Sequence, residues 1–375
     1  MSKTYRVGVI GFAHMHINNV LGLFAKHPQV ELVACADTAP DVPELRAGPY
    51  TRQWNLQHAL DELGMPQSYD SYEEMLDHES FDIVICTSEN AHHPGVVAAC
   101  AAAGANVCVE KPMAASLSDA LAMVRSVRAG GTKMLINWPM TWNPAARKAK
   151  ALIEAGAIGR VIGVKARLGH TGPLGSGAKH EGVAEEAAPL SATELGAVWW
   201  HNRAAGGGAM LDFCCYGCMI SRWLVGEPGV SAVGMRANLN SPWGDADDNG
   251  MMIVRFPGAM GLFEGTWTTR HHGVGGGPIV FGTEGTLVME SRDGKPVVRR
   301  ERGKGETTIH EPDPLPEGRA TIAEEFVHHL ETGEPVHPTL DMTFNLDAMA
   351  ILDAGVRSAD SGKEETVDSA AWCIG

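Results

Sequence analysis

Residues 107–112 read Val107-Cys108-Val109-Glu110-Lys111-Pro112 and give the clearest indication of the architecture of this chain. The apolar part is short, rich in valine and preceded by Gly104, which predicts a buried strand. Open α/β sheets bind ligands just beyond the carboxyl ends of their strands, and Pro112 biases Lys111 towards an extended conformation. We therefore expect Lys111 to face a ligand crevice, although the stretch taken alone is more typical of a surface salt bridge.

Strands and helices alternate along the chain on both sides of this stretch. Apolar runs predict strands at residues 6–11, 31–36, 81–87, 106–109 and 133–137, with helical patterns between them. This alternation predicts βαβ units and a parallel sheet covered by helices on both faces. Because 375 residues are enough for about two domains, we assign this sheet to a first domain, residues 1–140.

The pattern changes after Asn143-Pro144, where a second domain, residues 141–375, is expected to begin. A Gly/Ala/Glu-rich stretch at about 170–197 has little periodicity, and a loop of that length is typical of a functional lid or arm. Runs of predicted strands without intervening helices then follow, which indicates a mostly antiparallel sheet. These strands are expected at residues 230–236, 251–256, 260–268, 279–282, 286–289 and 296–299, and one more strand, 161–168, is expected before the Gly/Ala/Glu-rich stretch.

Composition and charge exclude several classes of protein. The hydrophobic content of 44% and the charged content of 20% are those of a globular chain. The formal net charge of −15 repels nucleic acid and anionic membranes, and no apolar stretch approaches the ~18 residues of a membrane span. The N-terminus leads straight into a predicted strand without a secretory signal pattern. We expect a cytoplasmic protein that binds neither nucleic acid nor membrane.

The cysteines and histidines do not have the spacing of a known metal site. Of eight cysteines, Cys215 and Cys218 form a C-x-x-C pair without a second pair to complete a zinc site. Histidine pairs such as His14-x-His16 are likewise unlike a known metal cage. The sequence therefore predicts no metal.

A degraded dinucleotide-binding turn follows the first predicted strand. Gly11, Ala13 and His16 occupy the three positions that are glycine in G-x-G-x-x-G. Asp37 ends the second strand 26 positions after Gly11, where a carboxylate binds ribose hydroxyls and repels a 2′-phosphate. This favours NAD over NADP, unless Arg46 or Arg52 folds back. The expected cofactor contacts are Gly11, Phe12, Ala13, His14, His16, Asp37, Thr87, Ser88, Asn90, His92, Glu110 and Lys111; helix packing or capping is the alternative for the two histidines.

Taken together, these features resemble the Gfo/Idh/MocA family of oxidoreductases. The matching pieces, in family order, are Gly8-Val9-Ile10-Gly11, Asp37, the turn from Thr87 to His92, Glu110-Lys111-Pro112, the run from Gly206 to Asp212, and Gly282-Thr283-Glu284-Gly285. The resemblance implies a Rossmann domain and a C-terminal domain whose open sheet mediates dimers or tetramers. It also implies NAD(P)-dependent oxidation of a secondary alcohol, or reduction of the ketone, in a sugar, inositol or sugar derivative.

The resemblance also implies a catalytic set of a lysine, an aspartate and a histidine four residues after the aspartate. Lys111 and Asp212 match, but the third position is Tyr216. Residues i and i+4 share one helix face, so Tyr216 can join the site; a core aromatic is the alternative. We expect Lys111 to polarise the substrate oxygen, Tyr216 to relay the proton and Asp212 to orient the pair. The ammonium would favour phenolate, and desolvation would favour the neutral amine.

The expected substrate contacts are Lys111, Trp138, His170, His201, Asp212 and Tyr216, although core packing is an alternative for the tryptophan. Two other functions stay open at this stage. The first is redox-neutral glycoside cleavage or elimination driven by transient NAD oxidation, because the family histidine is missing. The second is a non-catalytic NAD-binding regulator, against which the retained Lys111 and Asp212 argue.

Overall fold

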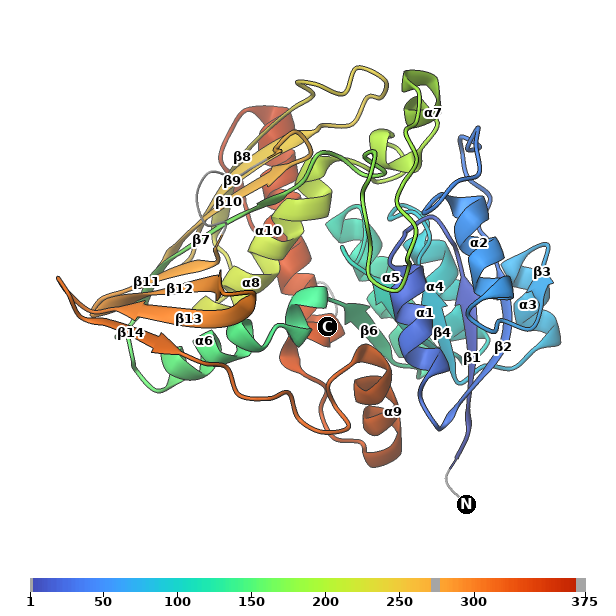
Figure 1. Ribbon diagram of the computed structural model, residues 1–375, viewed down its shortest axis with the longest axis horizontal. Helices are drawn as coiled ribbons and strands as arrows, with labels where there is room; N and C mark the ends of the chain where they lie inside the picture. Colours follow the sequence, from blue (N-terminus) through green and yellow to red (C-terminus); the bar gives the residue numbers. More distant parts are fainter. Residues whose placement is uncertain (1–2, 271–276, 369–375) are drawn as a thin grey trace.

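The computed structural model describes residues 3–270 and 277–368, which form two sheets with helices between and around them (Figure 1). The first sheet has six parallel strands in the order β3-β2-β1-β4-β5-β6. The chain order reverses between β1 and β4, as in a Rossmann fold. The strands are β1 (Tyr5–Ile10), β2 (Val30–Ala36), β3 (Ser68–Tyr69), β4 (Ile83–Cys86), β5 (Asn106–Glu110) and β6 (Met134–Asn137).

Helices cover both faces of this sheet. One face packs against α1 (Ile17–Ala25) and α9 (Ile322–Thr332), which share a core with it. The other face packs against α4 (His93–Ala102) and α5 (Leu117–Gly130). The helices α2 (Arg52–Asp61) and α3 (Tyr72–His78) complete this half of the molecule. The predicted doubly covered parallel sheet is confirmed.

The second sheet has nine strands in the order β14-β13-β12-β11-β7-β10-β9-β8-β15. Among the pairings of the described strands, that of β7 with β10 is parallel and the others are antiparallel. The predicted mostly antiparallel sheet is therefore confirmed. The strands are β7 (Val161–Gly169), β8 (Ser231–Ala237), β9 (Asn249–Arg255), β10 (Met260–Thr266), β11 (Ile279–Gly282), β12 (Gly285–Arg292), β13 (Lys295–Glu301), β14 (Thr307–His310) and β15 (Glu365–Thr366).

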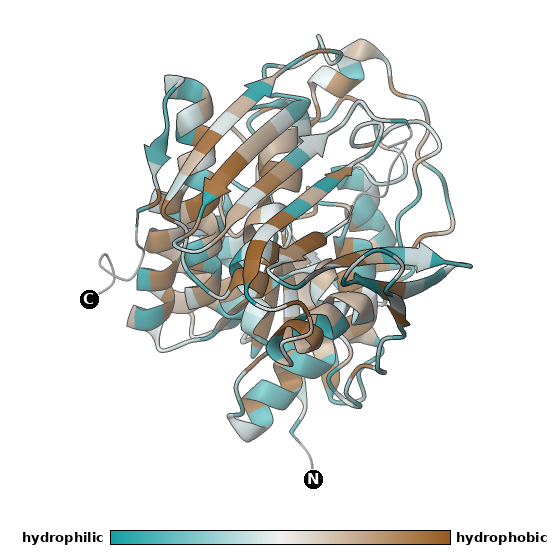
Figure 2. Ribbon diagram, turned by 90° about the vertical axis from the view of Figure 1, so that its left-hand side faces the viewer, coloured by the Kyte–Doolittle hydropathy of each residue, from teal (hydrophilic) through white to brown (hydrophobic). Residues whose placement is uncertain are grey.

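One face of the nine-stranded sheet is covered by helices and the other is open. On the covered face, α8 (Cys215–Val225) and α10 (Met342–Ser361) lie between the two sheets (Figure 1). Hydrophobic and hydrophilic residues alternate along several strands of this sheet (Figure 2), and the open face carries exposed apolar side chains that include Met251, Ile253 and Met260. The remaining helices and turns are α6 (Pro144–Glu154), α7 (Ala192–Gly196), the 3₁₀ turns η1 (Pro139–Trp142), η2 (Trp199–His201) and η4 (Pro338–Leu340), and the π-helical turn η3 (Met210–Cys214).

A long segment, residues 170–205, which we call the arm, returns from β7 across the first half of the molecule. In Figure 1 it is the green loop that descends towards α1. Trp199 Nε1 donates a hydrogen bond to Ala13 O (2.9 Å), and Tyr50 Oη donates to Glu185 O (2.6 Å). The arm therefore covers the turn between β1 and α1.

In the described part of the chain, we find no helix whose length and hydropathy would let it cross a bilayer. Three strands were not predicted from the sequence: β3, β14 and β15. Each has two to four residues and lies at or near a sheet edge, so it carries too few side chains to show a period.

Gly11 gives a testable consequence of this packing. Its φ is +88°, and a Cβ at this position would lie 2.5 Å from the backbone N of Ser88. Gly11→Ala should lower the free energy of unfolding in urea by about 2–3 kcal/mol, because strain and a backbone clash add. Gly104→Ala is the matched control, since its φ is +77° and no atom lies within 4 Å of its Cβ position; it should lose only about 1 kcal/mol. Equal losses would show that the Ser88 backbone does not constrain the turn.

Candidate active site

The end of β5 sends two consecutive side chains to opposite faces of the sheet. Cys108 lies in the core shared with α1, whereas Val107 and Val109 lie in the core shared with α4 and α5. Because side chains alternate along a strand, Glu110 emerges on the α1 side. Lys111 emerges on the side of η3 and α8. Each of the two forms a separate polar group.

Lys111 is bound to Asp212, as the sequence predicted. Its Nζ lies 2.5 Å from Asp212 Oδ1 and donates to Asp212 O at 3.3 Å. The other carboxylate oxygen, Oδ2, accepts a hydrogen bond from Trp267 Nε1 (3.0 Å). Asp212 comes from η3, directly after the glycine run, and both members of the pair are buried. The pair therefore joins the first sheet to the helix layer of the second.

The pair is ionised at neutral pH. Burial lowers the pKa of Lys111, but Asp212 and, after it, other nearby groups together outweigh burial and hold that pKa above its ordinary value. Burial raises the pKa of Asp212, but Lys111, His170 and the hydrogen bond from Trp267 together outweigh burial and hold that pKa below its ordinary value. Desolvation does favour the neutral amine, as expected, but the contact with the counter-charge keeps Lys111 ionised.

Tyr216 lies beside the pair with its ring rather than its hydroxyl towards the ammonium. Lys111 Nζ is 5.1 Å from the ring centroid, a cation–π contact. Burial raises the pKa of the Tyr216 phenol, and the opposing effect of Lys111 is smaller. The ammonium does favour the phenolate, as expected, but burial has the larger effect on the pKa, and Tyr216 is a neutral hydroxyl at neutral pH.

The other predicted substrate contacts differ in their placement. Trp138 is 2% exposed, donates to Asn345 Oδ1 (2.7 Å) and packs edge-on against Tyr216. His201 is also buried and packs edge-on against Trp267, which binds Asp212. Trp138 and His201 therefore pack against Tyr216 and Trp267, the residues that contact the Lys111–Asp212 pair. His170 is exposed and packs edge-on against Phe213, with ring centroids 5.1 Å apart.

His180 was not predicted, and the structure places its half-buried side chain near the site. It lies on the arm, 6.3 Å from the His16 ring between centroids. Burial lowers its pKa to about 4, and the charges of His16, His170, Asp212 and Lys111 also act on it. Its imidazole is neutral and close to both polar groups. No pattern in the sequence pointed to His180, because the arm has no periodicity.

A cavity of about 410 Å³ lies at the carboxyl ends of β2 and β3. Asp37 is in its wall, and Asp37 Oδ1 accepts from the backbone N–H groups of Phe12 and Thr38, each at 2.9 Å. Arg52 does fold back: its Nη1 lies 2.5 Å from Asp37 Oδ1, and its Nη2 pairs with Glu89. The further lining residues are Ala39, Asp70, Ser71, Tyr72, Glu73, Ala91, His92, Gly95 and Val96.

The predicted cofactor residues surround the turn between β1 and α1. Gly11 approaches Ser88 closely, and Thr87 Oγ1 donates to Gly11 O (2.6 Å). Asn90 Nδ2 donates to Gly206 O (2.8 Å), which ties this edge to the second half of the chain. His14 is 1% exposed, and among the described residues its Nε2 has no hydrogen-bond partner.

These features fit a dinucleotide. The cavity beside Asp37 suits an adenosine, and the turn at the start of α1 suits a pyrophosphate. The arm lies directly over that turn, and because Trp199 Nε1 is hydrogen-bonded to Ala13 O, a pyrophosphate bound at the turn would lie beside that contact or displace it.

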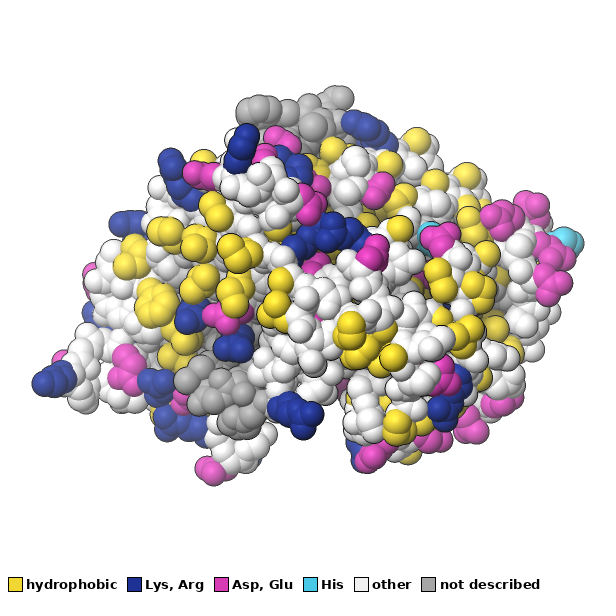
Figure 3. Space-filling model, turned by 90° about the horizontal axis from the view of Figure 1, so that it is seen from above, with side chains coloured by type: hydrophobic (Ala, Val, Ile, Leu, Met, Phe, Trp, Pro, Cys, Tyr) yellow, Lys and Arg dark blue, Asp and Glu magenta, His cyan; other side chains and the backbone are white. Residues whose placement is uncertain are grey.

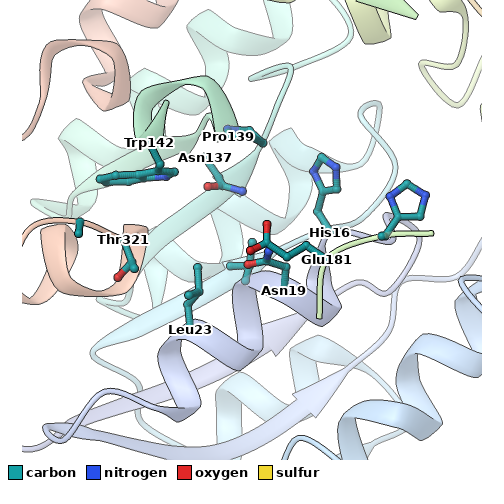
Figure 4. A pocket seen from close by; sticks show the side chains of 11 residues that line it. His16, Asn19, Leu23, Asn137, Pro139, Trp142, Glu181 and Thr321 are labelled. Atoms are coloured by element: carbon teal, nitrogen blue, oxygen red, sulfur yellow. The ribbon is translucent and has the colours of Figure 1, made fainter. Parts of the chain in front are cut away.

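A second cavity, of about 280 Å³, opens on the α1 side of the sheet (Figure 4). His16 and Asn137 line it, and both bind Glu110: His16 Nδ1 lies 2.9 Å from Glu110 Oε1, and Asn137 Nδ2 donates to Glu110 Oε2 (2.8 Å). The remaining lining residues are Asn19, Val20, Leu23, Pro139, Trp142, His180, Glu181, Ala320 and Thr321.

Comparison with known proteins assigns both halves of the chain. Residues 5–138 match the family model described as "Oxidoreductase family, NAD-binding Rossmann fold", and residues 146–288 match the one described as "GFO/IDH/MocA C-terminal domain". Solved structures agree in fold. The aldose–aldose oxidoreductase of Caulobacter crescentus, complexed with glycerol, superposes with a TM-score of 0.75 at 21% identity, covering 97% of this chain and 100% of that one.

Relatives of known activity are similar along much of the chain. Levoglucosan dehydrogenase of Pseudarthrobacter phenanthrenivorans is 26% identical over 260 residues, which are 63% of this chain and 62% of that protein, so the match spans less than two thirds of it. scyllo-Inositol 2-dehydrogenase (NAD(+)) of Bacillus subtilis is 24% identical over 77% of this chain and 75% of its own. D-Xylose 1-dehydrogenase (NADP(+)) 2 of Haloferax volcanii is 24% identical over 82% of this chain and 87% of its own. With both halves matched in order, the chain belongs to the Gfo/Idh/MocA family of oxidoreductases.

Proposed function

We propose that the protein is an NAD-dependent oxidoreductase that oxidises a secondary alcohol of a sugar, inositol or sugar derivative, or reduces the corresponding ketone. Residues 1–140 would bind the dinucleotide, and residues 141–375 would bind substrate and pair subunits. The buried Lys111–Asp212 pair is the observation that carries the proposal. Relatives named as dehydrogenases of levoglucosan, scyllo-inositol and D-xylose support a cyclic polyol or sugar as the substrate.

Stability does not explain why the chain buries this pair. A buried ion pair is often no more stabilising than apolar side chains of the same volume, because desolvation offsets the attraction. A buried ammonium is, however, well suited to polarise a substrate oxygen, since its field is screened less there than in water. We assign this role to Lys111 and assign to Asp212 the positioning of the ammonium.

The chemistry divides between the cofactor and the chain. Bound NAD would supply the hydride acceptor. Lys111 would hold the substrate oxygen, and Tyr216 would offer a neutral hydroxyl beside it, through which a proton can pass. Tyr216 cannot itself be the base that accepts that proton, because burial raises its pKa and keeps it from being the phenolate at neutral pH. The site therefore needs a further group that keeps the proton.

Arg52 supports NAD rather than NADP. Its guanidinium lies between Asp37 and Glu89, so its charge is already compensated by two carboxylates. Burial would raise the pKa of Glu89, but His92 and Arg52 outweigh it and lower it to about 2. A 2′-phosphate would meet these carboxylates without a free cation among the residues that line this cavity in the described ranges.

The open sheet face supports a homodimer or homotetramer. Met235, Met251, Ile253 and Met260 are between 46% and 75% exposed on neighbouring strands of this face. Figure 3 shows hydrophobic side chains gathered on the side of the molecule that carries this sheet. Exposed apolar patches of this kind mark interaction sites. We propose that two copies of the chain pair through this face.

Activity tests the proposed reaction. Purified protein with NAD should form NADH on at least one group in a panel of inositols, aldoses, anhydrosugars and glycosides, and should do so better than NADP forms NADPH. Lys111→Met should lower turnover by at least ~100-fold while cofactor binding, followed by fluorescence, stays within about threefold of wild type.

A second variant separates a loss of stability from a loss of catalysis in this test. Because Lys111→Met leaves Asp212 charged and unpaired, which costs about 3–5 kcal/mol, Lys111→Met/Asp212→Asn provides a neutral pair and should be as inactive but more stable. Turnover of either variant near the wild-type rate would contradict the proposal. Product release without NADH would favour redox-neutral cleavage, and cofactor binding without any turnover would favour a regulator.

Quaternary structure tests the proposed interface. Met251→Lys/Ile253→Lys should convert the oligomer to a monomer in size-exclusion chromatography with light scattering, because two charges would be buried on association. Leu45→Lys is the control, since Leu45 is 61% exposed but lies outside this sheet. An unchanged mass for the double variant would exclude this face as the interface.

A further inference from the structure

We propose that His16 is the group that accepts the proton of the substrate hydroxyl, as a general base held by Glu110 and Asn137 at the mouth of the 280 Å³ cavity. This inference rests on the proposed dehydrogenase function and deepens it. Neither the family's catalytic set nor the sequence analysis assigns chemistry to His16, which was expected to contact the cofactor or to cap a helix. The family's catalytic set has a histidine at the position of Tyr216, and His16 would supply the imidazole that this chain lacks there.

Three elements build this base. His16 precedes α1, Glu110 ends β5 and Asn137 ends β6, so all three meet at the carboxyl edge of the sheet. The carboxylate of Glu110, 1% exposed, uses one oxygen for His16 Nδ1 (2.9 Å) and the other for Asn137 Nδ2 (2.8 Å). Both oxygens are thus engaged, which fixes the orientation of the carboxylate and, through it, of the imidazole.

The charge of Glu110 sets the tautomer of His16. Burial would raise the pKa of Glu110, but His16 and Lys111 outweigh it and hold that pKa below its ordinary value. An ionised carboxylate only accepts hydrogen bonds, so His16 Nδ1 is the donor. The Nε2 lone pair of the neutral ring is then left to accept a proton. Carboxylate and imidazole have this relation in catalytic triads.

An ion pair with a purely structural role is a poorer explanation. His16 is the N-cap residue of α1, and no cap hydrogen bond involves its side chain. A permanent cation at a helix N-terminus is disfavoured by the helix dipole. A positive charge that forms on the imidazole during the reaction is compensated by Glu110.

His14 does not compete for the proton. His14 Nδ1 accepts from the backbone N–H of His16 (3.2 Å), which places its own proton on Nε2, 4.0 Å from Glu110 Oε1. Burial, followed by the effects of His16, Lys111, His180 and His93, lowers the pKa of His14 well below its ordinary value. His14 stays neutral, and its Nε2 proton has no hydrogen-bond partner among the described residues.

The tautomer of His14, with its proton on Nε2, argues against a metal ion at this site. His14, His16 and Glu110 place one possible ligand atom each within 4.8 Å of one another, a group that histidine spacing in the sequence could not reveal. A nitrogen must have a free lone pair to bind a metal ion. As long as His14 Nδ1 accepts the His16 N–H, His14 Nε2 carries the ring proton and has no free lone pair. The arrangement therefore favours a proton site over a cation site, and the test below includes metal content.

The cavity suits a small sugar or cyclic polyol. Trp142 and Pro139 give it flat apolar walls, while Asn19, Glu181 and Thr321 provide polar groups (Figure 4). Its volume lies near the lower end of ligand sites, about 300 Å³, which fits one small ring. Lys111 follows Glu110 in the chain, and His180, which lines the cavity, feels the charges of both His16 and Lys111. The cavity and the ammonium are therefore neighbours on the two sides of the end of β5, and the proposal requires the substrate to reach both.

The step balances as follows. The O–H bond of the substrate alcohol breaks, and its proton goes to His16 Nε2. The adjacent C–H bond breaks with its electron pair, which leaves as hydride to the oxidised dinucleotide, and the C–O bond becomes a carbonyl. Glu110 compensates the imidazolium. In the reverse direction, His16 returns the proton to the alkoxide oxygen as it forms.

Protonation of His16 should therefore control the rate of alcohol oxidation at low pH. Glu110, His14, His180 and Glu181 are the titratable groups around it. His16→Asn should lower kcat at pH 7 by at least ~100-fold, leave KM within about threefold, and abolish the decline of kcat towards low pH. The control His78→Asn alters an exposed histidine of α3 and should change none of these values.

Glu110→Gln tests positioning without requiring turnover. Removing the carboxylate charge should lower the pKa of His16 by about 1 unit or more, measured by NMR titration of histidine-labelled full-length protein and assigned with His16→Asn. The low-pH limb of kcat should move by the same amount. Identical His16 titrations in wild type and Glu110→Gln would overturn the proposal even if no substrate were found.

Two further outcomes would also overturn it. The first is a low-pH limb that persists in His16→Asn. The second is a stoichiometric divalent metal in the purified protein, measured by plasma mass spectrometry and lost in His16→Asn, because a metal-bound imidazole cannot accept the proton. If the dehydrogenase assay fails but the Glu110-dependent titration is present, the proposed function fails while the paired imidazole stands.

Discussion

The buried contact between Lys111 and Asp212 is the constraint on which the two halves of the protein depend. It joins the end of β5 in the parallel sheet to η3, which leads into the helices that cover the second sheet. Desolvation makes such a pair costly, so it persists only where its geometry is good and its remaining hydrogen bonds are made. Trp267 supplies one of these bonds. The pair therefore fixes how the halves meet and holds one positive charge at the meeting point.

Because side chains alternate along a strand, the consecutive residues Glu110 and Lys111 belong to two different polar groups. Lys111 faces the second half of the chain, and Glu110 faces α1, where it holds His16 and Asn137. The arm then encloses both, since it covers the turn at the start of α1 and brings His180 to the cavity. A dinucleotide and a small ring bound here would be shielded from water, which strengthens the field of the ammonium.

The sequence predicted the architecture well because periodicity and strand order are local signals. Alternating strands and helices were enough to anticipate both sheets, whereas the Lys111–Asp212 pair was anticipated only from the resemblance to the family. Other contacts that depend on long-range packing were missed. His16, Glu110 and Asn137 meet only because β1, β5 and β6 end at one edge, and His180 lies on an aperiodic segment. The effects expected on the pKa values of Lys111 and Tyr216 have the expected directions, but each is outweighed, because the sequence shows neither how closely Asp212 approaches nor how deeply the phenol is buried.

The structure of the full-length protein crystallised with NAD would be the most informative measurement on this site. We predict the adenosine in the cavity beside Asp37, the pyrophosphate at the turn covered by Trp199, and the nicotinamide in van der Waals contact with the space between Lys111 and His16. A dinucleotide bound with its nicotinamide away from Lys111 would contradict the account, because the ammonium could then not act on the bond that is oxidised.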